Sequence, residues 1–273
     1  MPSDHVPFRR VAQPGTVYLV GAGPGAADLI TLRGWHLLQT ADVIVYDSLA
    51  DPSLHAGLAA ERIDAGKRSG NHGLSQGDTT ALLIRLAQEG RAVVRLKGGD
   101  PFVLGRGSEE ALALAAAGVP CEVVPGVSSS LAAPLLAGIP LTHRGVADAF
   151  CVVSAHPRDT VKSATDPSGM ASIPPWQPRC TLVVLMGVAT LAEWLPLLAE
   201  RNYPQDLPIA FVTWAARPEQ TVLETTLGDA LDAAKRQGLR APAVAVIGPV
   251  VRLRHAMPPH LPALSDLPEG SPP

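Results

Sequence analysis

Short apolar runs that end in glycine-rich or charged turns constrain the fold of this sequence more than any other feature. The first run, residues 17–20, leads directly into the glycine-rich turn 21–25, and later runs end at Asp47, Lys97 and Pro125. Segments with the apolar spacing of a helix separate these runs. Strands that alternate with helices are typical of α/β proteins with parallel sheets. The sequence therefore predicts an α/β fold whose chemistry-bearing loops lie at the carboxyl ends of its strands.

Two series of strands and helices divide the chain. We expect an N-terminal α/β domain over residues 16–140 and a C-terminal α/β domain over residues 141–254. Residues 1–15 are predicted to form a flexible tail, and the proline-rich residues 255–273 a disordered one. A segment rich in Pro, Ser and Asp, at about 157–179, is predicted to be an exposed insert of the second domain.

Composition excludes several classes of protein. Of the 273 residues, 47% are hydrophobic and 17% are charged, and the formal net charge is −3. These values exclude disorder for most of the chain and lack the basic excess of a nucleic-acid-binding protein. The three cysteines form no CxxC pair, so we expect reduced thiols in a cytoplasmic protein and no metal site. Prolines interrupt the long apolar stretch 111–141, which predicts that it does not span a membrane.

The glycine-rich turn after the first strand leaves two interpretations open. A GxGxxG turn followed by an acidic residue at the next strand end, here Asp47, is the signature of a dinucleotide-binding fold. In this sequence Ala26 occupies the position of the third glycine, and Pro24 lacks the N–H that would meet a pyrophosphate. The turn is therefore a weak signal, and a tight strand-to-helix connection explains it equally well.

A second loop, after the predicted strand at residues 92–96, is more specific. It reads KGGDPFVLGRG over residues 97–107. The adjacent glycines allow a ligand to approach the backbone closely, and no phosphate-binding lysine of the Walker type follows. Asp100 and the carbonyl groups at the strand end are oxygen acceptors that suit a sulfonium or ammonium group. The loop therefore favours a nucleoside with a positive charge over a nucleotide with phosphates.

These turns occur in an order that resembles one known family. From about residue 16 to residue 253 the sequence is similar to the tetrapyrrole methylases, which use S-adenosyl-L-methionine, and the turn 21–25 is shared across that family. The runs RLKGGDPF at 95–102 and IPLTHR at 139–144 are closer to the branch that acts on uroporphyrinogen III. The resemblance implies two α/β domains of the tetrapyrrole methylase type, with the donor site in the cleft between them, and a homodimer.

The resemblance also implies roles for individual residues. Asp47, Lys67 and Arg106 match positions treated as catalytic, and charged residues that face the tetrapyrrole are matched by Arg106, Glu109 and Arg144. Contacts with the methyl donor are implied for Pro24, Gly98, Gly99, Asp100, Val103, Ser128, Ser129, Met186 and Ala215. Ala215 stands where the family commonly has glycine, so its side chain crowds a close backbone approach at that contact.

The implied activity is the methylation of two carbons of uroporphyrinogen III, which gives precorrin-2 for sirohaem, cobalamin or haem d1 synthesis and releases S-adenosyl-L-homocysteine. The substrate carries many carboxylates that are ionised at neutral pH, so its site needs local cations. Candidate cations, mostly in predicted loops, are Lys67, Arg68, His72, Arg95, Lys97, Arg106, His143 and Arg144. We expect this small molecule to be the partner of the protein, and we expect no nucleic acid.

Alternatives remain for single residues and for the whole protein. Arg106 and Glu109, three residues apart, could simply pair with each other. Asp47 could cap a turn, and Met186 could be an ordinary core residue. A methyltransferase that acts on another precorrin would share the fold and the donor. A nicotinamide-dependent dehydrogenase and a non-catalytic ligand-binding protein are candidates from other classes.

Overall fold

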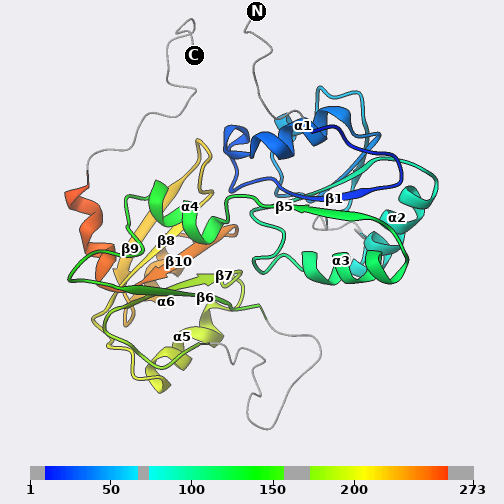
Figure 1. Cartoon of the computed structure of the whole chain (residues 1–273). Coiled ribbons are helices and arrows are strands. Elements are labelled where there is room, and N and C mark those ends of the chain that lie inside the picture. The colour runs from blue at the N-terminus through cyan, green and yellow to red at the C-terminus, as the bar shows by residue number, and fades with distance from the viewer. Residues whose placement is uncertain (1–9, 67–73, 157–172, 258–273) are drawn as a thin grey trace, which may run out of the picture. The chain divides into compact units, whose positions relative to one another are not determined.

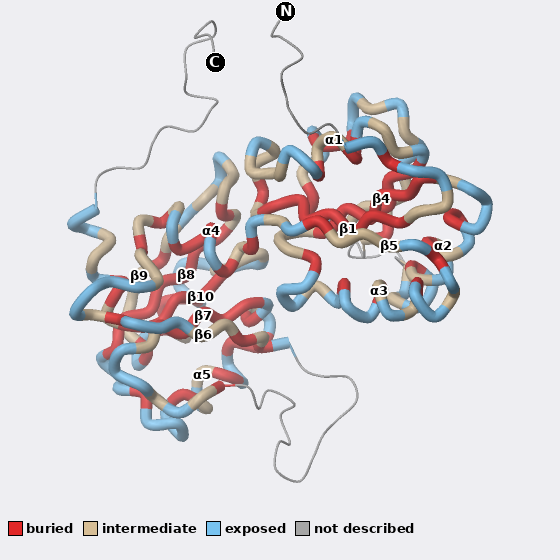
Figure 2. Tube along the Cα trace, in the orientation of Figure 1, coloured by how far each residue is buried: buried red, intermediate tan, exposed pale blue. Residues whose placement is uncertain are grey.

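The structure, a computed structural model, describes residues 10–66, 74–156 and 173–257, and the chain divides into two compact units, Met1–Ser129 and Ser130–Pro273 (Figure 1). Each unit contains one five-stranded sheet accompanied by helices. The central strands of both sheets are buried, whereas exposed residues lie mainly on helices and loops (Figure 2). The prediction of two α/β domains is therefore confirmed at the level of fold class.

The first unit is built on a sheet whose neighbouring strands all run parallel, in the order β3-β2-β4-β1-β5. The strands are β1 (Val17–Gly21), β2 (Val43–Tyr46), β3 (Glu61–Asp64), β4 (Val93–Lys97) and β5 (Cys121–Val124). Parallel strands end at the same edge of a sheet, so the turns that follow them are neighbours in space. The loops that the sequence singles out in this unit therefore share one edge.

Helices cover both faces of this sheet. They are α1 (Leu32–Thr40), α2 (Gln76–Gln88) and α3 (Gly107–Ala116), with the short 3-10 turns η1 (Ala27–Leu29) and η2 (Pro52–Leu54). Leu37 of α1 belongs to the same buried cluster as Val20, whereas Leu114 of α3 belongs to the cluster of Leu19. Val20 and Leu19 point to opposite faces because side chains alternate along a strand. Burial on both faces explains why β1 is a continuous apolar run.

The second unit contains a mixed sheet in the order β6-β7-β10-β8-β9. Its strands are β6 (Ala149–Ser154), β7 (Cys180–Leu185), β8 (Pro208–Thr213), β9 (Thr221–Thr226) and β10 (Ala243–Ile247). β6 and β7 are parallel, but β10 runs antiparallel to β7 and β8, and β9 runs antiparallel to β8. The prediction of a parallel sheet is therefore wrong for this unit. β6, β7 and β8 nevertheless point the same way, so their carboxyl ends lie at one edge.

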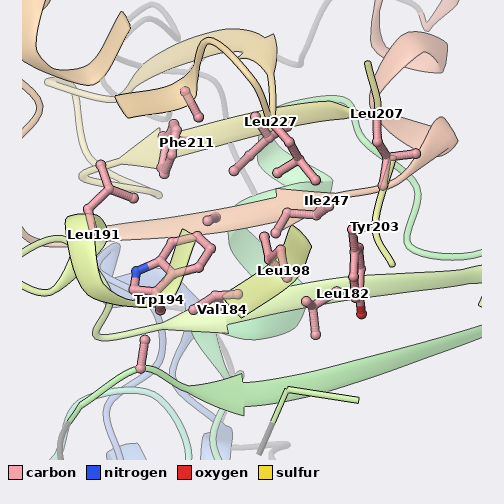
Figure 3. Close-up of a cluster of buried hydrophobic side chains, with 14 of the residues drawn as sticks. Leu182, Val184, Leu191, Trp194, Leu198, Tyr203, Leu207, Phe211, Leu227 and Ile247 are labelled. Carbon is pink, nitrogen blue, oxygen red and sulfur yellow. The ribbon is translucent and has the colours of Figure 1, made fainter. Parts of the chain in front are cut away.

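In the second unit, buried side chains of the helices pack against buried side chains of the sheet. The helices are α4 (Ser129–Leu136), α5 (Leu191–Glu200), α6 (Ala230–Arg236) and the 3-10 helix η3 (Pro249–Ala256). One buried cluster contains Trp194 and Leu198 of α5 together with Phe211 and Ile247 of the sheet (Figure 3). The Trp194 Nε1 donates a hydrogen bond of 2.8 Å to the Gly187 carbonyl. This bond fixes the first turn of α5 against the loop that follows β7.

The division of the chain at residues 129/130 differs from the domain boundary predicted at 140/141. The difference concerns α4, in which an interior proline, Pro134, interrupts the helical pattern of the sequence. Ala133 of this helix is fully buried in a cluster that contains Val246 of β10. Packing therefore assigns α4 to the second unit.

Parts of the predicted tail and insert contact the two units. Residues 10–15 lie against the first unit, where the Ala12 N–H donates to the Thr40 hydroxyl at 2.9 Å. Residues 157–172 of the predicted insert lie outside the described residues, but Trp176 packs against the core of the second unit. No helix in the described ranges combines the length and the apolar character that a membrane crossing requires.

α3 offers a matched test of core packing in the first unit. Leu114 is fully buried, whereas Leu112 of the same helix is 72% exposed. We expect Leu114→Ala to lower the free energy of unfolding by about 2–5 kcal/mol, because the shorter side chain leaves a cavity under the sheet. Leu112→Ala should change it by less than about 0.5 kcal/mol. Urea unfolding followed by circular dichroism measures both, and equal losses would contradict the packing.

His55 offers a pH-dependent test of the same unit. The residue is 5% exposed, its ring stacks on Tyr46 with 4.1 Å between centroids, and no described residue hydrogen-bonds to either ring nitrogen. Burial, followed by the positive charge of Arg62, lowers the pKa of His55 below its usual value. The carboxylates of Asp51 and Asp64 act in the opposite direction.

Because the unfolded chain binds this proton more readily than the folded protein, the free energy of unfolding should fall as the pH drops below about 6.5, the usual imidazole pKa. His55→Phe keeps the stacked ring and removes the titration. The variant should therefore lose less stability than the native protein between about pH 7.5 and about pH 5. Thermal melts at a series of pH values measure the difference, and parallel losses in the two proteins would argue against it.

Candidate functional site

Glycines bring the loops at the carboxyl edge of the first sheet into backbone contact. A Cβ on Gly21 would lie 2.6 Å from the Gly99 carbonyl oxygen, and a Cβ on Gly126 would lie 2.7 Å from the Gly21 Cα. These glycines end β1, follow β4 and follow β5. A side chain at Gly21 or Gly126 would push the loops apart, and Gly99 has a φ of +68°, which favours glycine. We call this arrangement of Gly21, Gly99 and Gly126 the glycine contact.

The backbone of the turn after β1 forms hydrogen bonds with the end of β4 and the loop that follows it. The Ala22 N–H donates to the Lys97 carbonyl at 2.7 Å, and the Gly23 N–H donates to the Gly99 carbonyl at 3.2 Å. The Gly99 N–H returns a bond of 2.8 Å to the Gly23 carbonyl. Pro24 has no N–H, and α1 begins only at Leu32. Two amides of this turn are therefore already bonded within the protein, and α1 begins too far along the chain to present its N-terminus to a pyrophosphate here.

Asp100 fastens two of these loops together. One carboxylate oxygen accepts from the Phe102 N–H at 2.8 Å, and the other accepts from the Gly126 N–H at 3.1 Å. The sequence predicts that the Asp100 carboxylate contacts a ligand. The structure shows that both of its oxygens also accept hydrogen bonds from backbone N–H groups. Each oxygen of an ionised carboxylate can accept a further hydrogen bond, so the two roles are compatible.

The other donor residues predicted in the first unit surround the glycine contact. Among the described residues, a Cβ on Gly98 would meet only the Leu49 side chain, at 3.4 Å, so the backbone there is open to close approach. A Cβ on Gly99 would lie 3.7 Å from the Ser129 backbone nitrogen. The structure thus brings to one edge the predicted donor residues Pro24, Gly98, Gly99, Asp100, Ser128 and Ser129.

The loop that leads into α3 is strained and exposes apolar side chains. Leu104 and Arg106 have φ values of 54° and 56°, which residues other than glycine seldom adopt. Phe102, Val103 and Leu104 are 55%, 38% and 43% exposed. Backbone strain of this kind clusters at ligand-binding sites, where the surrounding structure holds it in place.

Arg106 and Glu109 form an exposed ion pair with two contacts. Arg106 Nε and Nη2 donate to the two carboxylate oxygens of Glu109 at 3.0 and 2.7 Å, and this hydrogen bonding lowers the pKa of Glu109. Both side chains are more than half exposed. The pairing that their spacing allows is therefore present. Exposed pairs contribute only about 0–1 kcal/mol, so Arg106 can exchange this carboxylate for another at small cost.

Two cations predicted to serve the substrate are buried, which corrects that prediction. Arg95 and Lys97 of β4 are 4% and 3% exposed. Glu110 of α3 is fully buried and contacts both, at 3.3 Å from Arg95 Nε and 3.0 Å from Lys97 Nζ. Gln76 of α2 donates to the same carboxylate at 2.9 Å. These side chains are held inside the unit and do not form a loop surface for carboxylates.

Arg95 also reaches Asp47, the residue that follows β2. Its Nη2 forms an ion pair with Asp47 Oδ1, and the Asp47 side chain is 32% exposed. Burial lowers the pKa of Lys97, and the positive charge of Arg95 acts in the same direction, whereas Glu110 and Asp47 oppose it. We call Asp47, Arg95, Lys97 and Glu110 the charge cluster. It holds two cations and two anions, and Asp47 is the member that reaches solvent.

Glu110 is the one member of the charge cluster that is not among the residues predicted from the sequence. A signal for it is present, because Arg95 and Lys97 occupy alternate positions of an apolar strand and point to the same face as the buried Val93. Buried charges require partners of opposite sign. Glu109 and Glu110 lie in the first turn of the helix that follows this strand, so either is a candidate partner, and the structure shows that Glu110 is the buried one.

Other predicted charged residues lie elsewhere in the chain. Lys67, predicted as catalytic, lies outside the described residues, as do Arg68 and His72. Arg144 is exposed in a turn of the second unit, which is closed by backbone hydrogen bonds between His143 and Ala147. The roles of these residues toward a substrate stay predictions from the sequence.

The second unit has a strained edge of its own, at the carboxyl ends of β7 and β8. Met186, Trp214 and Ala216 have φ values of 57°, 50° and 63°. Met186 is 48% exposed, so it is not an ordinary core residue, whereas Ala215 is buried in a cluster on the sheet. The two donor residues predicted in this unit, Met186 and Ala215, therefore follow strands that end at the same edge.

The chain is similar to known proteins over most of its length. The family described as Tetrapyrrole (Corrin/Porphyrin) Methylases matches residues 16–231. Uroporphyrinogen-III C-methyltransferase of Methanocaldococcus jannaschii is 42% identical over 243 residues, which cover 88% of this chain and 98% of that protein. Siroheme synthase of Gluconacetobacter diazotrophicus is 43% identical over 249 residues, which cover 90% of this chain but 52% of that protein. The chain thus spans about half the length of this second relative.

A solved structure extends the similarity to three dimensions. Uroporphyrin-III C-methyl transferase from Thermus thermophilus, crystallised in complex with S-adenyl homocysteine, is similar with a TM-score of 0.73 and 39% identity. The match covers 87% of this chain and 99% of that one. The residues that the family matches, 16–231, include both sets of loops described above. The chain belongs to the tetrapyrrole methylase family.

Proposed function

We propose that this chain is an S-adenosyl-L-methionine-dependent methyltransferase that methylates two carbons of uroporphyrinogen III and so forms precorrin-2. The observation that carries the proposal is the glycine contact at the carboxyl edge of a parallel sheet, in a chain that the family matches over residues 16–231. A relative named for this reaction is 42% identical over 98% of its own length, which supports the same substrate.

The geometry of the first unit favours this donor over a nicotinamide dinucleotide. A pyrophosphate needs N–H donors and a helix N-terminus, but the Ala22 and Gly23 amides are bonded within the protein. A sulfonium needs oxygen acceptors, and the Asp100 carboxylate retains this capacity. We assign donor contacts to Pro24, Gly98, Gly99, Asp100, Val103, Ser128 and Ser129 in the first unit, and to Met186 and Ala215 in the second.

The protein's part in the reaction is alignment, exclusion of water and removal of a proton. When bound, the donor supplies a methyl group on a positively charged sulfur to an electron-rich pyrrole carbon. The exposed apolar side chains of the loop 102–104 can keep water from the reacting groups. A proton must then leave the macrocycle. We assign this acid/base role to Asp47, which is partly exposed at the end of β2, with Lys67 as its partner.

The substrate's carboxylates account for the charged residues at the edge of the site. The Arg106 guanidinium can hold both oxygens of a carboxylate, as it does with Glu109 in the structure. We assign tetrapyrrole contacts to Arg106, Glu109 and Arg144, and include Arg106 in the catalytic set because it would orient the macrocycle. The downstream pathway (sirohaem, cobalamin or haem d1), the homodimer, the cytoplasmic location and the lack of a nucleic-acid partner stay predictions from the sequence.

The direct test incubates the protein with uroporphyrinogen III and methyl-labelled S-adenosyl-L-methionine in the absence of oxygen. We expect labelled precorrin-2 that carries two added methyl groups, together with S-adenosyl-L-homocysteine. Label on another precorrin but not on uroporphyrinogen III would assign the chain to another branch of the family. Binding of a nicotinamide dinucleotide without binding of S-adenosyl-L-homocysteine would contradict the donor.

Gly126→Ala tests the glycine contact. The added methyl group would meet Gly21 and Gly99 and would displace the N–H that Asp100 holds. We expect the affinity for S-adenosyl-L-homocysteine to fall by about tenfold or more, because the loops must separate. Gly57→Ala is the control, since the described residues leave open space there, and its affinity should stay within about twofold. Calorimetric titration measures both, and unchanged affinity in Gly126→Ala would separate the glycine contact from the donor site.

Arg106→Ala tests the substrate contact. It should lower kcat/KM for uroporphyrinogen III by about tenfold or more, because a two-pronged contact with a carboxylate is lost. Affinity for S-adenosyl-L-homocysteine should change by less than about twofold. Arg85→Ala, which breaks a similar exposed pair with Glu89 on α2, is the matched control and should leave both quantities unchanged. Equal losses of turnover and affinity in Arg106→Ala would argue against its role toward the substrate.

A further inference from the structure

Arg95 lies at the centre of the charge cluster and is held from several directions. Its Nε lies 3.3 Å from the Glu110 carboxylate, and its Nη1 donates weakly to the Val45 and Leu96 carbonyls at 3.4 and 3.5 Å. Its Nη2 donates to Asp47 Oδ1. A guanidinium is planar and rigid, so contacts at two of its nitrogens fix the third. The position of the paired Asp47 oxygen is therefore set from inside the protein.

The members of the charge cluster differ in how far they are buried. The Arg95 and Glu110 side chains are 4% and 0% exposed, whereas the Asp47 side chain is 32% exposed. Arg95, Lys97 and Glu110 alone hold two cations and one anion, and Asp47 supplies the second anion. Buried ions keep a fixed geometry only when each has its partners. The charge cluster is thus a rigid frame with a single carboxylate directed outward.

We propose that Arg95 is a positioning residue for the methylation reaction, that it acts through Asp47, and that Glu110 anchors it. The inference rests on the proposed function, because it takes Asp47 as the group that handles the proton of the macrocycle. Proton transfer needs hydrogen-bond reach of about 2.6–3.2 Å, and a carboxylate that turns freely loses that alignment. Arg95 holds Asp47 Oδ1, while Oδ2 has no hydrogen-bond partner among the described residues and is left for the substrate.

A double-mutant cycle separates positioning from packing. Arg95→Met removes the guanidinium but leaves Glu110 paired with Lys97, so no buried charge is left alone. We expect Arg95→Met to lower kcat with uroporphyrinogen III by about tenfold or more in the native background, because the carboxylate loses its alignment. In an Asp47→Asn background the same change should lower kcat by less than about twofold. KM for the tetrapyrrole and the Kd of S-adenosyl-L-homocysteine should change by less than about twofold in both.

Two further variants complete the design. Arg91→Met is the control, because Arg91 precedes the same strand and pairs with Glu61 at 3.1 Å on an exposed surface. Its kcat should stay within about twofold of the native value. Arg95→Lys replaces Arg95→Met in the cycle if the methionine variant does not fold. A lysine keeps the buried charge but cannot contact Asp47 and Glu110 together, so the same loss of kcat is expected.

Each outcome bears on the proposal. Equal fold losses of kcat in the two Asp47 backgrounds would overturn the positioning role and indicate a structural one. So would a loss of donor affinity as large as the loss of kcat, or native activity in Asp47→Asn. A native protein that binds S-adenosyl-L-homocysteine but does not turn over uroporphyrinogen III would instead refute the proposed substrate, and the role of Arg95 in this reaction would fall with it.

Discussion

The candidate site of the first unit depends on the backbone contact among Gly21, Gly99 and Gly126. Three strands of one parallel sheet end there, and their loops approach to distances that a side chain at Gly21 or Gly126 would prevent. The same approach commits the Ala22 and Gly23 amides to bonds within the protein. With these two amides already bonded, the edge suits a phosphate less well, but the Asp100 carboxylate can still accept from a cationic ligand. The way the backbone packs therefore supports the proposed positively charged donor over a dinucleotide.

The charge cluster of the same sheet has a different physical basis. Buried ion pairs are costly to desolvate, and apolar residues of similar size would often stabilise a fold equally well. Stability alone therefore does not explain why Arg95, Lys97 and Glu110 are buried against the sheet. The proposed positioning of Asp47 explains it better. The two features meet at Lys97, whose carbonyl accepts from the turn after β1 and whose ammonium pairs with Glu110. β4 therefore links the candidate donor loop to the candidate acid/base residue.

The spacing of apolar residues along the sequence was enough to predict the buried strands and the glycine-rich loops, but not the edge strands or the contacts between distant segments. β1 and β2 are continuous apolar runs because they are buried, and the equally buried β4 is apolar apart from Arg95 and Lys97. The edge strands β3 and β9 carry polar, partly exposed residues and lack such runs. α4 is hard to predict from the sequence, because Pro134 lies inside the helix and proline usually interrupts one. The glycine loops could be located from the sequence because closely packed backbone leaves no room for a side chain, so glycine is required there. Local pattern could indicate that Arg95 and Lys97 need a buried partner, but it could not predict the whole charge cluster. Asp47, Arg95 and Glu110 meet only after β2 pairs with β4 and α3 folds over them.

Backbone strain supports the site without any use of sequence similarity. Among the described residues, those other than glycine that have a positive φ are Leu104, Arg106, Met186, Asn202, Trp214 and Ala216. Asn202 follows the end of α5, where a left-handed residue is an ordinary helix cap. The others all follow the carboxyl ends of β4, β7 and β8, and each costs about 1–3 kcal/mol that the rest of the fold must offset. Glycine would adopt these angles at a lower cost. Both units therefore keep strain in the loops that carry residues assigned to the donor or the tetrapyrrole.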